Sequence, residues 1–368
     1  MVPADRLSRT AAAAGGAVWL ALGLAPGLDL IRWLMLLGPL VAVPLGLGLV
    51  FADAPADPRA RRLLDLARRA QPVAAAAGVA GFFVEPPAVG LALALCWVAL
   101  TGIVAMAGLV RLVARGVGPL PEASVDAGMI YLPVGAAWMT AARMHWTVLG
   151  FSGDMVPLTG AHFHFAGFSA PILVGLTGRL VLAKGSPRAR RVAVLAAAGA
   201  IAGPPLVAAG ITFSRALELP GAAILAACLL ASAALAVTVA RPSFASPAAR
   251  GLLNVSSLSL VLTMALAVTY AAARVMHAED AVPIRFMARW HGVGNALGFA
   301  VCGLLAWTIR TGDVSAPRPS GSGGPRNPRR LPTWRPPLAW RRNPRGTERA
   351  EVRTRRYPLT SVSSARLR

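Results

Sequence analysis

Apolar runs long enough to cross a bilayer recur along most of the chain, separated by short polar connections. A helix needs about 20 apolar residues to cross a hydrocarbon core about 30 Å thick. The pattern predicts ten spans, over residues 11–24, 30–51, 72–84, 88–113, 125–142, 159–182, 192–213, 220–240, 252–273 and 288–309. Because a helix satisfies its own backbone hydrogen bonds in lipid and an open sheet does not, we predict an all-α, polytopic transmembrane bundle.

Local signals refine the ends of these spans. The arginine-rich stretch 53–71 is predicted to be an amphipathic or irregular loop, which leaves 72–84 as a short span. Ser124 and Thr159 stand just before apolar runs and are the predicted N-caps of the fifth and sixth spans. The pair Pro204-Pro205 is expected to bend or break the seventh span.

Arginines are concentrated in every second connection, and this bias predicts the orientation of the chain. Positively charged loops stay on the cytoplasmic side of a membrane. With ten spans, the rule places both termini and the arginine-rich connections in the cytoplasm. Residues 11–24 could instead be the apolar core of a cleaved signal peptide, but the next span follows almost at once, which favours a retained helix.

Composition supports a membrane protein and argues against a nucleic-acid binder. The chain is 56% hydrophobic and 14% charged, and its mean hydropathy is +0.60. From Ser315 onward there are 14 Arg and two Glu, so about half of the net charge of +22 lies in the tail. A basic nucleic-acid-binding protein would need a soluble domain of recognisable fold, and the sequence contains none.

The chain therefore divides into a transmembrane helical bundle, 1–312, and an Arg- and Pro-rich cytoplasmic tail, 313–368. The tail has too few apolar residues to bury a core and is predicted to be disordered. Anionic lipid of the inner leaflet would attract it. A non-functional extension, such as a frame-shifted end in GC-rich DNA, explains its composition more simply.

The three cysteines, Cys96, Cys228 and Cys302, each lie inside an apolar run and none belongs to a Cys-x-x-Cys pair. Buried cysteine usually behaves as a small apolar residue. We predict neither a disulfide framework nor a thiolate metal site.

Histidines carry the candidate chemistry. The predicted topology places all five, His145, His162, His164, His277 and His291, at or near the outer face. Ionisable groups at membrane depth are costly and usually mark a functional site. The candidate residues for substrate binding or proton relay are His162, His164, His291, Asn295, His145 and Glu218.

The spacing of these residues limits what they can do together. His162 and His164 would lie about 200° apart on a regular helix and cannot share a face. Either one points into the bundle and the other sideways, or the helix is irregular at its Thr159-Gly160 start. His291 and Asn295 are four residues apart and share one face. The alternative is structural: interfacial histidines bonded to loop carbonyls, and Glu218 as a charge that caps a helix.

Two further interpretations concern metal and charge. His162, His164 and His291 could ligate Zn, Cu or Fe together with a carboxylate. Because the usual His-Glu-x-x-His and His-box spacings are absent, we predict no cofactor and keep the metal site as the alternative. Arg179, near the inner end of the sixth span, could pair with Asp126 or extend to the cytoplasmic surface.

The motifs HFHFAGF at 162–168, WHG at 290–292 and NALGF at 295–299 resemble those of the YndJ-like family of bacterial membrane proteins. The resemblance covers about 125–309 and implies a multi-pass protein of the bacterial cytoplasmic membrane. It also implies that His162, His164, His291 and Asn295 belong to the family pattern.

Together these features predict a membrane protein, more simply a transporter of a small solute than an enzyme, with a polar site lined by histidine that faces outward. Two alternatives stay open: a membrane-embedded, metal-dependent enzyme, and a sensor or assembly subunit without transport activity. The expected partners are the lipid bilayer and an unidentified solute.

Overall fold

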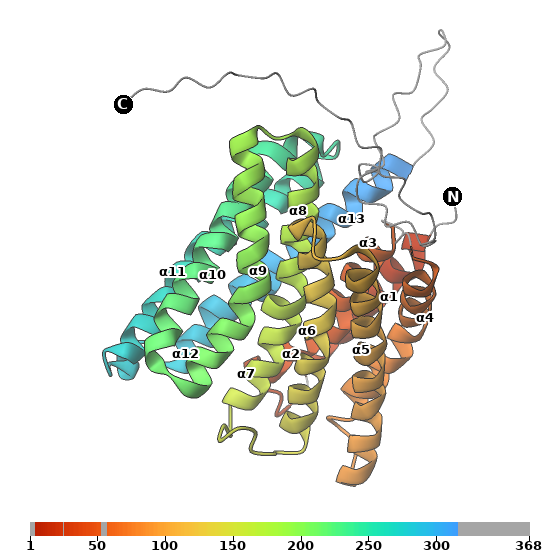
Figure 1. Ribbon diagram of the computed structural model, residues 1–368. Coiled ribbons are helices and arrows are strands. Elements are labelled where there is room, and N and C mark those ends of the chain that lie inside the picture. Colours follow the sequence, from red (N-terminus) through yellow and green to blue (C-terminus); the bar gives the residue numbers. More distant parts are fainter. Residues whose placement is uncertain (1–3, 25, 53–56, 316–368) are drawn as a thin grey trace, which may run out of the picture. The chain divides into compact units, whose positions relative to one another are not determined.

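The computed structural model of the protein describes residues 4–24, 26–52 and 57–315, and these residues form helices and connections without a strand (Figure 1). The predicted tail lies outside the described residues from residue 316 on. The elements are α1 (Ala4–Leu22), α2 (Leu30–Leu37), η1 (Gly38–Ala42), α3 (Val43–Ala52), α4 (Pro58–Ala80), α5 (Pro87–Arg115), α6 (Leu120–Arg143), α7 (Met155–His162), η2 (Phe163–Ser169), α8 (Ala170–Lys184), α9 (Pro187–Phe213), α10 (Arg215–Leu235), η3 (Ala236–Ala240), η4 (Arg241–Ser243), α11 (Pro247–Val275), η5 (Glu279–Ala281), α12 (Ile284–Met287), η6 (Ala288–Gly292), η7 (Gly294–Val301) and α13 (Cys302–Ser315).

These elements join end to end into ten long helical segments within the described ranges, so the predicted all-α bundle is confirmed. Seven segments are long and apolar enough to cross a membrane: Leu30–Ala52, Pro87–Arg115, Met155–Lys184, Pro187–Phe213, Arg215–Ser243, Pro247–Val275 and Ile284–Thr311. The other three are α1, α4 and α6. Each of them carries charged or small polar residues among its apolar ones.

The prediction of a polar loop at 53–71 followed by a short span was wrong, because α4 is one continuous helix. Asp57 caps its start by accepting hydrogen bonds from the backbone N–H groups of Arg59 and Ala60. Further along, Asp65 forms ion pairs with Arg68 and Arg69, three and four residues away. Ion pairs at this spacing stabilise a helix, which explains why the charged stretch is helical.

Both predicted N-caps were also wrong, because each helix begins four residues before the predicted cap. Ser124 lies within α6, and its hydroxyl donates a hydrogen bond to the carbonyl of Pro171 at 2.8 Å, which joins α6 to α8. Thr159 lies within α7 and donates to the carbonyl of Met155. Helix α9 continues through Pro204-Pro205, so the helix is not broken there.

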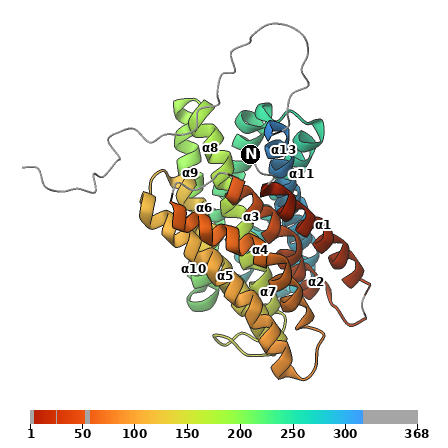
Figure 2. The same cartoon turned by 90° about the vertical axis from the view of Figure 1, so that its right-hand side faces the viewer.

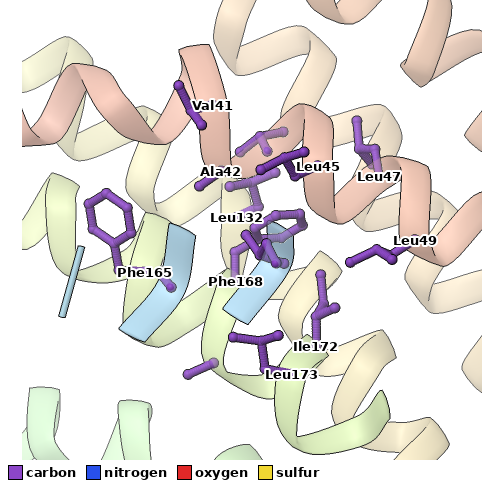
Figure 3. Packing of buried hydrophobic residues seen from close by; sticks show 14 of the residues in the cluster. Val41, Ala42, Leu45, Leu47, Leu49, Leu132, Phe165, Phe168, Ile172 and Leu173 are labelled. Carbon is purple, nitrogen blue, oxygen red and sulfur yellow. The ribbon is translucent and has the colours of Figure 1, made fainter. Parts of the chain in front are cut away.

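The segment α2–η1–α3 lies at the centre of the core, and its most apolar 18 residues are all buried. It packs against η2 and α8, where Phe168 and Ile172 are fully buried beside Leu45 (Figure 3). Gly46 permits this approach: a Cβ atom there would lie 2.6 Å from the Phe168 ring. Small residues let membrane helices approach closely, and that is the role of Gly46.

The connections between segments gather at two ends of the bundle (Figures 1 and 2). Connections 144–154 and 276–283 lie at one end, and 185–186 and 244–246 lie at the other. This alternation agrees with the grouping predicted from the arginines. That the end carrying 185–186 faces the cytoplasm stays a prediction.

The glycine contact yields a stability prediction. Gly46→Ala should lower the free energy of unfolding by about 1–3 kcal/mol, because the added methyl group overpacks the contact with Phe168. The matched control is Gly102→Ala on α5, where an added Cβ meets nothing within 4 Å; it should be neutral or stabilising, because alanine favours helix over glycine. Thermal unfolding of both variants in detergent, followed by tryptophan fluorescence, measures the difference. A Gly46→Ala protein that melts no lower than the control would contradict this packing.

Candidate functional site

His164 is enclosed where four helical segments meet. Its ring lies between two glycines: a Cβ at Gly38 of η1 would lie 2.7 Å from the His164 side chain, and one at Gly135 of α6 would lie 2.8 Å from Nδ1. The third neighbour is Trp97 of α5, with ring centroids 6.0 Å apart and planes inclined by 14°. His164 is fully buried as a result.

Both ring nitrogens of His164 are occupied by protein partners. The indole N–H of Trp97 donates to Nε2 at 3.2 Å, so Nε2 carries no proton. The proton is then on Nδ1, which donates to the carbonyl of Gly160 at 2.7 Å. This arrangement satisfies a buried imidazole completely. His164 thus joins α5 to the helix that carries it, and in this arrangement it has no free nitrogen for a ligand.

His162 and His291 lie side by side, although 129 positions separate them in the sequence. Their ring centroids are 6.1 Å apart and the planes are inclined by 25°. The Nδ1–H of His162 donates to the carbonyl of Leu158 at 2.9 Å. Its Nε2 has no partner among the described residues, and the side chain is exposed. His162 therefore offers a free ring nitrogen next to a second imidazole.

His291 is held by a small polar network on two helices. Its Nδ1–H donates to the backbone carbonyl of Thr263 on α11 at 2.8 Å. Its Nε2 accepts a hydrogen bond from the amide of Asn295 at 3.1 Å. The Asn295 oxygen in turn lies 3.0 Å from the hydroxyl of Thr263. The predicted shared face of His291 and Asn295 is present, and Thr263 is the member that sequence reasoning missed.

Widened, π-helical turns explain how these residues come together. His164 lies in η2, His162 directly precedes η2, His291 lies in η6 and Asn295 lies in η7. The segments η1, η2 and η7 contact one another within the bundle. Turns of this kind are rare and occur frequently at functional sites. His162 and His164 nevertheless lie in different surroundings, as a separation of about 200° predicts: His164 is fully buried, whereas His162 is exposed.

Two of the predicted site residues lie in other settings. The Glu218 carboxylate is buried and accepts a hydrogen bond from Arg274 of α11 at 2.9 Å. His145 is exposed and lines a pocket with Arg32 and Arg143. His277 lies in the connection after α11, where its Nδ1 accepts a hydrogen bond from Arg215 at 2.8 Å. The histidines thus belong to several settings rather than one.

A buried ionic cluster lies at the N-terminal end of α6. The predicted pair of Arg179 with Asp126 was wrong. Arg179 of α8 instead binds Glu122. Asp126 is fully buried and pairs with Arg111, at 2.6 Å, and with Arg115, both on α5. A buried carboxylate needs such partners to remain charged. The cluster ties α5, α6 and α8 together, and the acidic residues one turn apart at 122 and 126 were its signal in the sequence.

Within the part of the chain that the structure describes, no three His, Cys, Asp or Glu side chains are placed to share a metal ion. The three histidines of the alternative metal site do not form one set of ligands. His162 and His291 are adjacent, and His164 uses both nitrogens for protein contacts. Among these three rings, only Nε2 of His162 has no protein partner within the described residues.

Comparison with known proteins identifies relatives of the chain. The family described as YndJ-like protein matches residues 33–299. The "Uncharacterized membrane protein YndJ" of Bacillus subtilis (strain 168) is 31% identical over 287 residues, which cover 77% of this chain and 50% of that protein. The chain thus spans about half the length of this curated relative. No solved structure matches.

The Trp97–His164 contact predicts a specific loss of stability. Trp97→Phe removes the donor to His164 Nε2 and leaves a buried, unsatisfied nitrogen, which costs about 1–3 kcal/mol in addition to the lost packing. The control is Trp146→Phe, at an exposed position in the connection after α6. Thermal unfolding of the two variants should differ by several degrees. Equal melting temperatures would show that the contact does not hold the bundle together.

Proposed function

From the premise that the chain belongs to the YndJ-like family of membrane proteins, we propose that it moves a small polar solute across the membrane through a site formed by His162, His291 and Asn295. The observation that carries the proposal is the stacked His162–His291 pair, in which two separate helical segments each contribute an imidazole. His164 has a structural role beside this site, because its hydrogen bonds hold the π-helical turn that follows His162.

The chemistry of the pair suits a solute that donates a hydrogen bond, because one ring nitrogen stays free as an acceptor. The unbonded Nε2 of His162 can accept a hydrogen bond while its Nδ1–H is held by the backbone. His291 is oriented from both sides by Thr263 and Asn295, so its ring is preorganised.

The helices that carry the pair are of the kind found at transporter sites. Binding sites in transporters use interrupted helices, since their irregular backbone can line a polar cavity and rearrange. Here α7–η2–α8 and α12–η6–η7–α13 each join α-helical and π-helical turns. A change at the widened turns would alter the spacing of His162 and His291 while the flanking α-helices keep their packing. The predicted topology places this site toward the outer face.

A flux measurement tests the proposal. The purified chain is reconstituted into liposomes and screened with labelled amino acids, organic acids, amines and phosphate, with an entrapped pH dye to report protons. For any solute that moves, His162→Ala and His291→Ala should each reduce the flux about tenfold or more, the effect of removing about 1.4 kcal/mol of binding. His277→Ala is the control, because that residue lies in an exposed connection.

Two outcomes would contradict the proposal. One is a chain that moves none of the solutes while remaining folded in the liposomes, which would favour a sensor or assembly role. The other is a flux that survives both substitutions unchanged, which would place the path elsewhere in the bundle. Elemental analysis of the same preparation measures bound Zn, Cu and Fe, and a stoichiometric amount would favour the metal-dependent alternative.

A further inference from the structure

A pocket of about 440 Å³ lies at the end of the bundle that carries connections 144–154 and 81–86. Its polar lining is cationic: Arg32 of α2, Arg143 at the end of α6, and His145. Its apolar lining includes Leu28, Phe82 and Phe83. No carboxylate is among the residues that line it. The volume falls within the range of small-molecule sites, about 300–1,000 Å³.

Arg143 is the deepest cation of this pocket, with only 9% of its side chain exposed. Its Nε donates to the carbonyl of Gly81 and its Nη2 to the carbonyl of Val84, at the C-terminal end of α4. The end of a helix favours a cation, which explains how a buried guanidinium is tolerated there. Its Nη1 has no partner among the described residues, so two N–H donors stay available.

The carboxylates near the pocket balance these charges only weakly. Glu85 lies 3.1 Å from Arg143 Nη2, but its side chain is 72% exposed, and Asp29, which pairs with Arg32, is 40% exposed. Ion pairs that exposed contribute little, so an anion with better geometry can compete with them. Guanidinium groups bind phosphate with paired hydrogen bonds.

We propose that this pocket binds an anionic phosphate group that carries a short apolar chain. Arg32, Arg143 and His145 would hold the phosphate, and Phe82, Phe83 and Leu28 would cover the chain. The site is separate from the His162–His291 pair and does not depend on the transport proposal. A phospholipid headgroup or a soluble alkyl phosphate would present this chemistry.

The experiment uses the full chain in phosphatidylcholine nanodiscs. Phosphatidylglycerol is mixed into one set, and hexyl phosphate or inorganic phosphate is added to the others. Native mass spectrometry measures the retained ligand, and thermal unfolding measures stabilisation. The double variant Arg32→Gln/His145→Gln removes two of the three cations and spares Arg143, which holds the 81–84 turn. The control is Arg190→Gln, an exposed arginine at the start of α9.

We expect the wild type to retain phosphatidylglycerol over phosphatidylcholine, or to bind hexyl phosphate more tightly than inorganic phosphate. The first result identifies a lipid source and the second a soluble one. The double variant should bind about tenfold more weakly, whereas the control should bind as the wild type does. A double variant that binds like the control overturns the proposal. Equal retention of both lipids, together with equal or absent binding of the two phosphates, also overturns it.

Discussion

The structure depends on the close contact of His164 with two glycines and a tryptophan in the middle of the bundle. In lipid, polar groups must find partners within the protein, because water is absent. The His164 ring meets this requirement through Trp97 and Gly160. Gly38 and Gly135 leave room for the ring, so η1 and α6 can approach it from either side. The buried α2–η1–α3 segment and the wide turn η2 are both positioned by this contact.

The position of η2 in turn determines the candidate site. His162 immediately precedes the turn, and His291 and Asn295 lie in η6 and η7 on the last helical segment. Because η1, η2 and η7 contact one another, fixing one of them restricts the other two. Buried charges in the bundle also depend on contacts between helices. Asp126 is fully buried, and the two arginines that pair with it offset the cost of burying its charge.

The sequence was sufficient for the fold class, because long apolar runs have few structural solutions in lipid. It also identified the family and the residues of the imidazole pair. It did not predict the helical start of α4, because a window average over an arginine-rich stretch is polar even when its charges pair along one face of a helix. Ser124 and Thr159 were misplaced as N-caps because a hydroxyl before an apolar run is typical of a cap. Here both hydroxyls instead donate hydrogen bonds to carbonyls within the bundle.

The site was harder to predict because contact between distant residues does not follow from spacing. The separation of His162 from His164 follows from helical spacing, but the π-helical turn that begins at Phe163 has no clear sequence signal. Nothing in the sequence indicated that Thr263 orients His291, or that His145 joins Arg32 and Arg143. Arg179 was likewise matched with Asp126 because both lie near the inner ends of their predicted spans, whereas packing of α8 brings Arg179 to Glu122.

The most direct test of the account is whether residues 162 and 291 lie together in the membrane. In a chain without Cys96, Cys228 and Cys302, His162→Cys and His291→Cys are combined, and a protease site is inserted at Gly185-Ser186. A short thiol crosslinker is applied in membranes before cleavage. We expect the two fragments to stay joined in the double variant and to separate in each single variant. Fragments that separate in the double variant, although both cysteines react with a maleimide, would contradict it.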